Sequence, residues 1–253
     1  MSRGKSKQSG IAGLTDLESS LTNAVKHFWV RKGVQRKHQG QASGRKDSGS
    51  RQDVTGGKHV DGLVDVFVEL LLVNGIDPDS IYHSGKKKLQ LPGYFRAEKQ
   101  WDLLVVHEGR LLACLELKSM GSSFGNNFNN RAEEVIGLGH DLRVAFGAGA
   151  FKESSRPWVG YLMLLADSPA ATREVKVIEP HFEVDQVFKH ASYEQRYCAC
   201  FKRLVGEGLY NRCALLLASP ETRGTWREPD EQLAVRGFAA SLAAHCIGEL
   251  AGR

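Results

Sequence analysis

The sequence of 253 residues predicts an α/β fold, a mixed β-sheet flanked by helices. Short apolar runs of strand length alternate along the chain with longer segments whose apolar residues recur at helical spacing. The hydrophobic content of 42% is sufficient for a substantial core. The sequence has no apolar run of 18 residues and no apolar segment directly after its basic N-terminus. We therefore expect neither a membrane span nor a secretory signal, and a cytoplasmic location.

The N-terminal part is expected to contain a tail, a helix and a loop. Residues 1–14 predict a basic disordered tail that precedes a single domain over 15–253. Residues 15–31 begin with a capping-box signature and carry apolar residues at helical spacing, which predicts the first helix. Residues 38–59 are rich in glycine, serine and basic residues, including Arg45. They predict a long mobile loop that is suited to ordering on a phosphate backbone.

A second, strongly apolar helix is predicted over residues 60–73, and the Asn-Gly pair that follows is typical of a helix end. Asp61, Asp65 and Glu69 are spaced by four and form one acidic stripe along it. The stripe is either the solvent face of the helix or part of a functional site, and the sequence leaves both interpretations open. The remaining predicted elements are a basic, turn-rich segment at 81–100 with Lys86 and Lys87, a hairpin at 101–119, a helix at 131–146, a strand at 158–166, a helix at 192–206, a strand at 212–218 and a helix at 229–250.

The basic charge is concentrated in the first quarter of the chain. Residues 1–60 hold 12 lysines and arginines against 4 acidic residues, whereas residues 61–253 hold 22 against 25. This asymmetry favours contact with a polyanion such as nucleic acid, although a solvated tail would also explain it.

Cysteine and histidine usage argues against disulfides and against a histidine-based metal site. The five cysteines contain no C-x-x-C pair, and several lie inside apolar runs, as buried reduced thiols do. The nine histidines show no pairing at helical spacing. Any bound metal is therefore expected to be a hard cation held by carboxylates.

Two charged residues, Glu116 and Lys118, lie in the apolar stretch WDLLVVHEGRLLACLELKS. Such side chains are almost never fully buried unless they are paired. The stretch is either a half-buried strand with a charged outer face or a metal-dependent active site. An acidic residue two positions before a lysine is expected about twice by chance in this composition, and it occurs twice. The second instance, Glu174 with Lys176, lacks clustered amides and cations around it and is interpreted as a surface strand.

The predicted hairpin decides whether Asp102 can join Glu116 and Lys118. A three-residue turn at 107–109 would pair Asp102 with Cys114 and set it diagonal to Glu116 on the same face. A two-residue turn would place Asp102 on the opposite face. Two carboxylates and an ammonium at one sheet end are what metal-assisted phosphodiester hydrolysis requires.

An asparagine cluster follows the charged strand directly. Its amides can pair bidentately with adenine, and arginine does so with guanine, which favours a base-reading segment. The alternative is a turn that leads to a helix N-cap, where asparagine is also favoured. The candidate DNA-reading residues are Asn126, Asn127, Asn129, Asn130 and Arg131.

These motifs resemble a known family. Asp102 followed by Glu116-Leu117-Lys118 is similar to the PD-(D/E)xK nuclease pattern, and LPGYFRAEKQWDLLVV, LELKS and SFGNNFNNRAEE resemble the XhoI-type restriction endonucleases. The likeness extends over most of the chain and includes TGGKHVDG, PHFEVD and ASYEQRY. One departure is Trp101, which stands where the wider superfamily often has proline.

The resemblance implies a restriction-endonuclease-like fold and a type II enzyme that cuts a short palindrome in duplex DNA, CTCGAG, with 5′ overhangs. It also implies Mg²⁺ as cofactor, a homodimer, a cognate DNA methyltransferase as functional partner and a bacterial cytoplasmic location. Two alternatives stay open at this point. One is a non-catalytic DNA-binding protein of the same fold, and the other is a structure-specific repair or junction nuclease.

The resemblance also implies roles for particular residues. Asp102, Glu116 and the main-chain carbonyl of Leu117 would hold Mg²⁺, and Lys118 would position and activate the attacking water. An acid from the preceding helix, Asp61 or Asp65, would support this site. From their charge, Lys86, Lys87 and Arg45 are expected to contact DNA phosphates without reading sequence.

Overall fold

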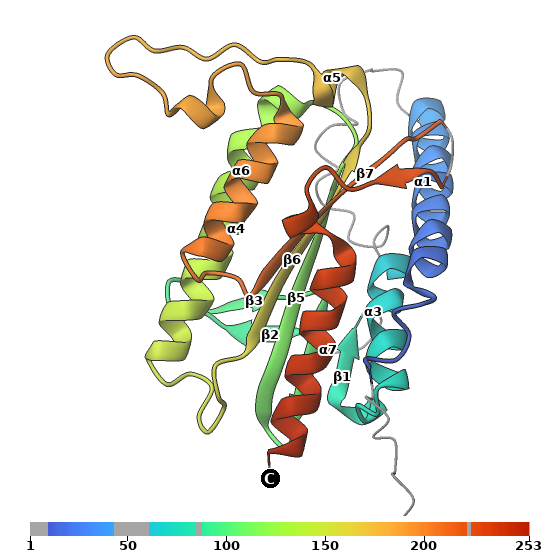
Figure 1. The fold of residues 1–253 in the computed structure, drawn as a ribbon, viewed down its shortest axis with the longest axis vertical. Coiled ribbons are helices and arrows are strands. Elements are labelled where there is room, and N and C mark those ends of the chain that lie inside the picture. Colours follow the sequence, from blue (N-terminus) through green and yellow to red (C-terminus); the bar gives the residue numbers. More distant parts are fainter. Residues whose placement is uncertain (1–9, 43–60, 84–87, 222–223, 253) are drawn as a thin grey trace, which may run out of the picture.

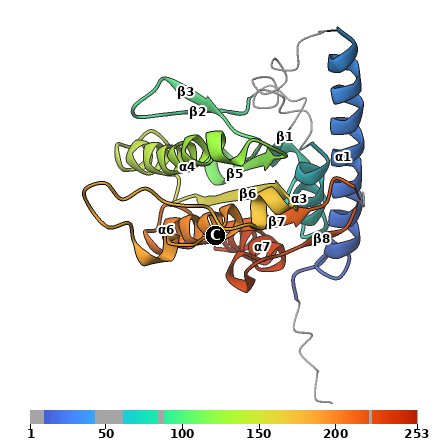
Figure 2. The ribbon, with the colours of Figure 1, turned by 90° about the horizontal axis from the view of Figure 1, so that it is seen from above.

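The computed structural model describes residues 10–42, 61–83, 88–221 and 224–252. A six-stranded sheet in the order β1-β4-β5-β6-β7-β8 forms its centre (Figure 1). Helices α4 and α6 cover one face of this sheet, α3 and α7 cover the other, and α1 packs outside α3 (Figures 1 and 2). The predicted mixed sheet flanked by helices is thus confirmed.

The sheet strands are β1 (Ile81–His83), β4 (Leu103–His107), β5 (Arg110–Met120), β6 (Trp158–Ala166), β7 (Arg212–Ala218) and β8 (Trp226–Arg227). A separate two-stranded hairpin is formed by β2 (Gln90–Pro92) and β3 (Glu98–Gln100). The helices are α1 (Leu17–Ala42), α3 (Asp61–Val73), α4 (Phe124–Gly147), α5 (Pro169–Thr172), α6 (Tyr193–Gly206) and α7 (Val235–Ala251). Across these residues no helix is both long and apolar enough to cross a bilayer.

The central strands are predominantly apolar because helices cover both of their faces. β5 pairs in parallel with β6, and β6 in parallel with β7. Every residue of β6 is buried. Strands covered on both faces carry continuous apolar runs. The predicted strands at 158–166 and 212–218 are confirmed, and only β5 carries charged residues into this core.

The hairpin of β4 and β5 forms in a different way from the one predicted. Its turn has two residues, Glu108 and Gly109, with φ angles of 50° and 76°, which is a type I′ geometry. The predicted three-residue turn is therefore wrong. A β-bulge at Leu112 shifts the register, so that Val106 pairs with Leu111 but Val105 pairs with Ala113.

The bulge places Asp102 on the same face as Glu116 despite the two-residue turn. Beyond it, Leu103 pairs with Leu115, and the Asp102 N–H donates to the Leu115 carbonyl at 3.2 Å. Asp102 therefore lies across from Glu116 and shares its face. The backbone at the bulge is satisfied from outside the hairpin, because the Leu111 N–H donates to the buried Ser154 Oγ at 3.0 Å.

Two boundaries near the ends of the chain differ from the predictions. Helix α1 continues through 38–42, where the mobile loop was predicted to begin, and the two glutamines and the alanine of this segment are residues that favour helices. The rest of that loop, with Arg45, lies outside the described residues, as do Lys86 and Lys87. The last helix begins at Val235, after a short 3₁₀ turn at Glu231–Leu233.

Helix α4 begins at Phe124, so the asparagine cluster lies in its first turns and not in a preceding loop. Phe124 and Phe128 are one turn apart and pack on the aromatic ring of Tyr193, and Phe128 also packs on Tyr197. This packing against α6 outweighs the weak helix propensity of asparagine.

We expect Ser154→Ala to lower the free energy of unfolding by ~1–2 kcal/mol, because it leaves the Leu111 N–H buried without an acceptor. Urea unfolding would measure the change, with Ser122→Ala at an exposed position as the control. Equal stability of both variants would mean that the bulge does not depend on this hydrogen bond.

Candidate active site

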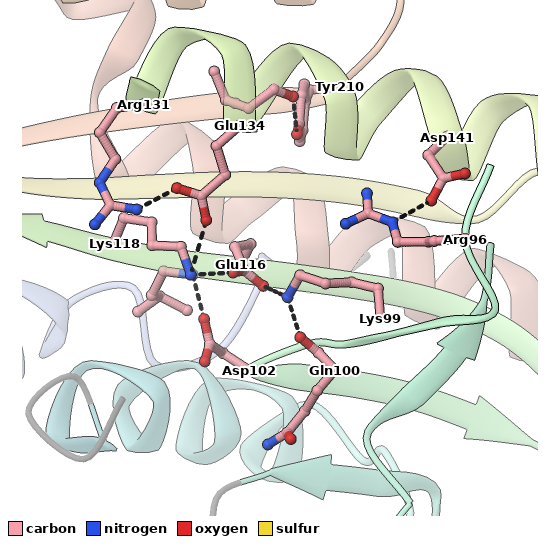
Figure 3. A network of polar contacts seen from close by, with 12 residues as sticks. Arg96, Lys99, Gln100, Asp102, Glu116, Lys118, Arg131, Glu134, Asp141 and Tyr210 are labelled. Carbon is pink, nitrogen blue, oxygen red and sulfur yellow. Dashed lines mark hydrogen bonds and ion pairs between the residues drawn. The ribbon is translucent and has the colours of Figure 1, made fainter. Parts of the chain in front are cut away.

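Two neighbouring strands bring the three predicted catalytic residues together. Asp102 precedes β4, whereas Glu116 and Lys118 project from the same face of β5 (Figure 3). The Glu116 side chain is only 1% exposed, and its neighbour on β6 is the fully buried Tyr161. The structure therefore places a charged carboxylate inside the core, next to two partners predicted from the sequence.

Two ammonium groups bind Glu116. Its Oε2 accepts a hydrogen bond from Lys99 Nζ at 2.9 Å, and its Oε1 accepts one from Lys118 Nζ. A buried charge is costly unless it is paired and hydrogen-bonded, and here both oxygens are. This pairing explains how Glu116 is accommodated in an apolar strand.

Asp102 is held by the backbone of β5. Its Oδ2 accepts a hydrogen bond from the Leu117 N–H at 2.7 Å. Burial, followed by the nearby charge of Glu116, raises the pKa of Asp102 to about 6, although the Leu117 N–H and the ammonium of Lys118 oppose this shift. Two carboxylates in such proximity resist joint ionisation, and a cation between them would relieve the repulsion.

The oxygen donors at this site fit a hard divalent cation. Asp102 and Glu116 supply carboxylates, and the Leu117 peptide lies beside Asp102. Within the described part of the chain, no group of three or more histidine, cysteine, aspartate or glutamate side chains could hold a metal. Two carboxylates completed by main-chain, water and phosphate oxygens are the type of site that Mg²⁺ prefers.

Lys118 carries a charge in this environment. Burial alone would favour its neutral amine, but the carboxylates of Glu116 and Glu134 raise the pKa of Lys118 above its ordinary value. In this form Lys118 offers a positive charge and three N–H donors, and it has no lone pair with which to accept a proton. An ammonium in this position can orient a water molecule and stabilise negative charge on a phosphate.

Two residues of the site were missed in the sequence. Glu134 of α4 lies 3.5 Å from the Lys118 ammonium and also pairs with Arg131, and Lys99 of β3 holds Glu116. Glu134 follows the asparagine cluster at helical spacing, and Lys99 lies shortly before Asp102. Their nearness in the sequence to these predicted residues was the only signal that Glu134 and Lys99 belong to the site, because local spacing does not encode contacts between separate elements.

The proposed supporting acids line a pocket beside α1 and β1. Asp61 and Asp65 belong to α3 and line a polar pocket with His27, Arg31 and His83. Asp65 is 4.0 Å from His83, at the limit of an ion pair. None of the three predicted catalytic residues lines this pocket. A supporting role for either acid stays a prediction.

The asparagine cluster begins at the same end of the sheet. Asn126, Asn129 and Asn130 are exposed, whereas the Asn127 amide donates to the Ser123 carbonyl at 3.0 Å. The Arg131 side chain is 11% exposed and paired with Glu134. Through Glu134 the cluster is therefore connected to Lys118, and Arg131 could reach a base only by leaving that pair.

The competing Glu174-Val175-Lys176 triplet lies at the surface, as predicted. Glu174 is exposed and pairs with His190 at 2.6 Å. Glu174 forms only an isolated bridge to Ser192, so the predicted strand is absent there. The Glu174-Val175-Lys176 triplet is thus an exposed counterpart of the Glu116-Leu117-Lys118 triplet.

We expect Asp102→Asn to stabilise the fold at pH 8 by ~1–3 kcal/mol, because it removes a buried carboxylate next to Glu116. The folded state holds its proton up to about pH 6, whereas the unfolded state releases it near the ordinary pKa of 3.8. The free energy of unfolding therefore falls as pH rises across this window, and Asn avoids that loss.

Denaturation at pH 8 and at ~4 would compare the stability of Asp102→Asn with that of the wild type, because the difference should vanish at the lower pH. Asp16→Asn at an exposed position is the control, and an unchanged stability of Asp102→Asn at pH 8 would contradict the raised pKa.

Comparison with known proteins identifies the family. The model of the restriction endonuclease XhoI family matches residues 39–227. The type II restriction enzyme BstVI of Geobacillus stearothermophilus is 48% identical over 219 residues, which cover 83% of this chain and 96% of the relative. AbrI of Azospirillum brasilense is 42% identical over 71% of this chain and 81% of its own, and XhoI of Xanthomonas vasicola is 41% identical over 68% and 70%. No solved structure matches. The chain belongs to the XhoI family of type II restriction enzymes, which are site-specific deoxyribonucleases.

Proposed function

We propose that this protein is a Mg²⁺-dependent endonuclease that hydrolyses both strands of duplex DNA at the palindrome CTCGAG and leaves 5′ overhangs. The observation that carries the chemistry is the convergence of Asp102, Glu116 and Lys118 on one face of the hairpin. The resemblance of the chain to XhoI-type enzymes supports the proposed recognition sequence. A cognate methyltransferase would protect the host DNA in a restriction–modification system.

Each catalytic residue has a distinct task in this proposal. Asp102, Glu116 and the Leu117 carbonyl would hold Mg²⁺, which supplies charge neutralisation at the phosphate and acidifies bound water. Lys118 donates hydrogen bonds to the attacking water and orients it toward phosphorus. Glu134 holds the Lys118 ammonium at 3.5 Å and so keeps the lysine directed at the site. Asp61 or Asp65 would supply an additional acid from α3.

The DNA is contacted by separate groups of residues in this proposal. The exposed amides of the asparagine cluster read bases next to the scissile phosphate. Lys86, Lys87 and Arg45 neutralise phosphates. A homodimer presents one such site to each strand of the palindrome. Residues 15–253 would form the single endonuclease domain, with 1–14 as its basic tail.

The alternatives from other classes have less support. A non-catalytic DNA-binding protein would have no need to bury Glu116 between two lysines. A junction nuclease could share the same catalytic centre. Digestion of branched DNA in parallel with plain duplex would separate it from a restriction enzyme.

We expect Glu116→Gln and Lys118→Met to lower the cleavage rate by at least ~100-fold while specific binding stays measurable, because both residues carry chemistry and not base contacts. Plasmid digestion with Mg²⁺ and mapping of the ends would measure rate and site together. Glu174→Gln and Lys176→Met are matched controls at the exposed triplet. Cleavage near the wild-type rate in the Glu116 and Lys118 variants would place the active site elsewhere.

Replacement of Asn126 or Asn129 by alanine should weaken binding to the cognate site by ~1–3 kcal/mol and leave non-specific binding nearly unchanged. Both side chains are exposed on the first turns of α4, so their loss should not disturb packing. Binding would be measured on CTCGAG and on its single-base variants. Asn23→Ala at an exposed position of α1 serves as the matched control. Full cognate preference in both cluster variants would assign base reading to other residues.

A further inference from the structure

Lys99 occupies a position in the site that the proposed mechanism leaves unexplained. It belongs to β3 of the separate hairpin, and its Nζ donates to Glu116 Oε2 at 2.9 Å. The same ammonium donates to the Gln100 carbonyl and lies 5.5 Å from the centre of the Trp101 ring. Its side chain is 21% exposed, so solvent and ligands can reach it.

The two lysines on Glu116 differ in their other contacts. Lys118 has a second carboxylate partner, Glu134, which would retain it if Glu116 turned to another cation. The remaining contacts of Lys99 that the structure shows are a neutral carbonyl and an aromatic ring. A divalent ion bound to Glu116 would lie close to both ammonium groups and repel them. Lys99 therefore dissociates from Glu116 more easily than Lys118 does.

The hairpin that carries Lys99 is fixed at its other end. The buried Asp141 of α4 accepts hydrogen bonds from the N–H groups of Tyr94 and Phe95, both at 2.8 Å, and from Arg96 Nε at 2.7 Å (Figure 3). Gly93 completes this turn, because an added Cβ would lie 2.7 Å from Asp141. The backbone of the hairpin is thus anchored to the helix that follows the catalytic strand. Movement of the Lys99 ammonium then requires only rotation of its side chain.

We propose that Lys99 exchanges Glu116 for a phosphate of the DNA substrate when a divalent ion binds, so that ion and DNA bind cooperatively. This inference rests on the proposed function, since it takes duplex DNA as the substrate. An ammonium displaced from a carboxylate requires another anion, and the backbone phosphate at the site is the anion that the reaction itself supplies. Because binding free energies are reciprocal, DNA would strengthen ion binding by the same factor by which the ion strengthens DNA binding.

The test is Lys99→Met, which keeps the length of the side chain and removes its charge. Calorimetric titration with Ca²⁺ in the absence of DNA should give an affinity at least ~5-fold tighter than wild type, because one competitor for Glu116 is lost. Lys88→Met removes an equal charge from the exposed approach to β2 and should leave this affinity within about twofold. Unchanged or weaker Ca²⁺ binding by Lys99→Met would overturn the proposal and leave Lys99 as a structural partner of Glu116.

The DNA side of the exchange is measured with Ca²⁺ present and a duplex containing CTCGAG. Lys99→Met should weaken binding and flatten the log–log salt dependence by ~0.9, the value for one phosphate contact, and Lys99→Arg should restore the slope. An unchanged slope would contradict a phosphate contact. Neither readout requires cleavage, so these results are independent of whether plasmid digestion supports the proposed function.

Discussion

The arrangement of the site depends on the buried charge of Glu116. A carboxylate that is 1% exposed must be matched by cations, and the chain supplies them from two elements, Lys118 on the same strand and Lys99 on a separate hairpin. Lys118 in turn pairs with Glu134, and Glu134 pairs with Arg131. Positive and negative groups therefore alternate from the β3 hairpin across β5 to α4. Replacement of any member leaves its neighbours with an unbalanced charge in a region of low dielectric constant.

The apolar framework holds this row of charges in place. β5, β6 and β7 are covered on both faces, so the backbone that carries Glu116 and Lys118 has little freedom to move. On the other side of the site, Phe124 and Phe128 fix the start of α4 against α6. The same contacts that bury apolar area thereby set the distance between Lys118 and Glu134. The packing of the core therefore also determines the geometry of the candidate active site, as expected for sites built on regular elements.

The sequence was most informative where local patterns and burial agree. The strands β6 and β7 were predicted to the residue from their continuous apolar runs, and the helix predicted over 192–206 begins at Tyr193, after a capping box at Ser192 that the structure shows. The start of α4 was missed because asparagines are typical of loops, and only the partners of Phe124 and Phe128 on α6 make the helix favourable. Asp102, Glu116 and Lys118 were recognised from the strand pattern and a family resemblance. Lys99 and Glu134 come from other elements, and nothing in local spacing pairs them with Glu116 or Lys118.

The two-residue turn and the Leu112 bulge together determine whether Asp102 and Glu116 lie on the same face of the hairpin. Consider two residues that lie on opposite strands of an antiparallel hairpin and share a face. If the turn has an even number of residues, their sequence numbers differ by an odd number, and each bulge residue changes this difference from odd to even or back. Asp102 and Glu116 are separated by an even number of positions, so turn and bulge residues together must be odd in number. The chain satisfies this with a two-residue turn and one bulge, where a three-residue turn alone would also have served. A single insertion or deletion in this hairpin therefore separates the two acids onto opposite faces unless a second change restores the count.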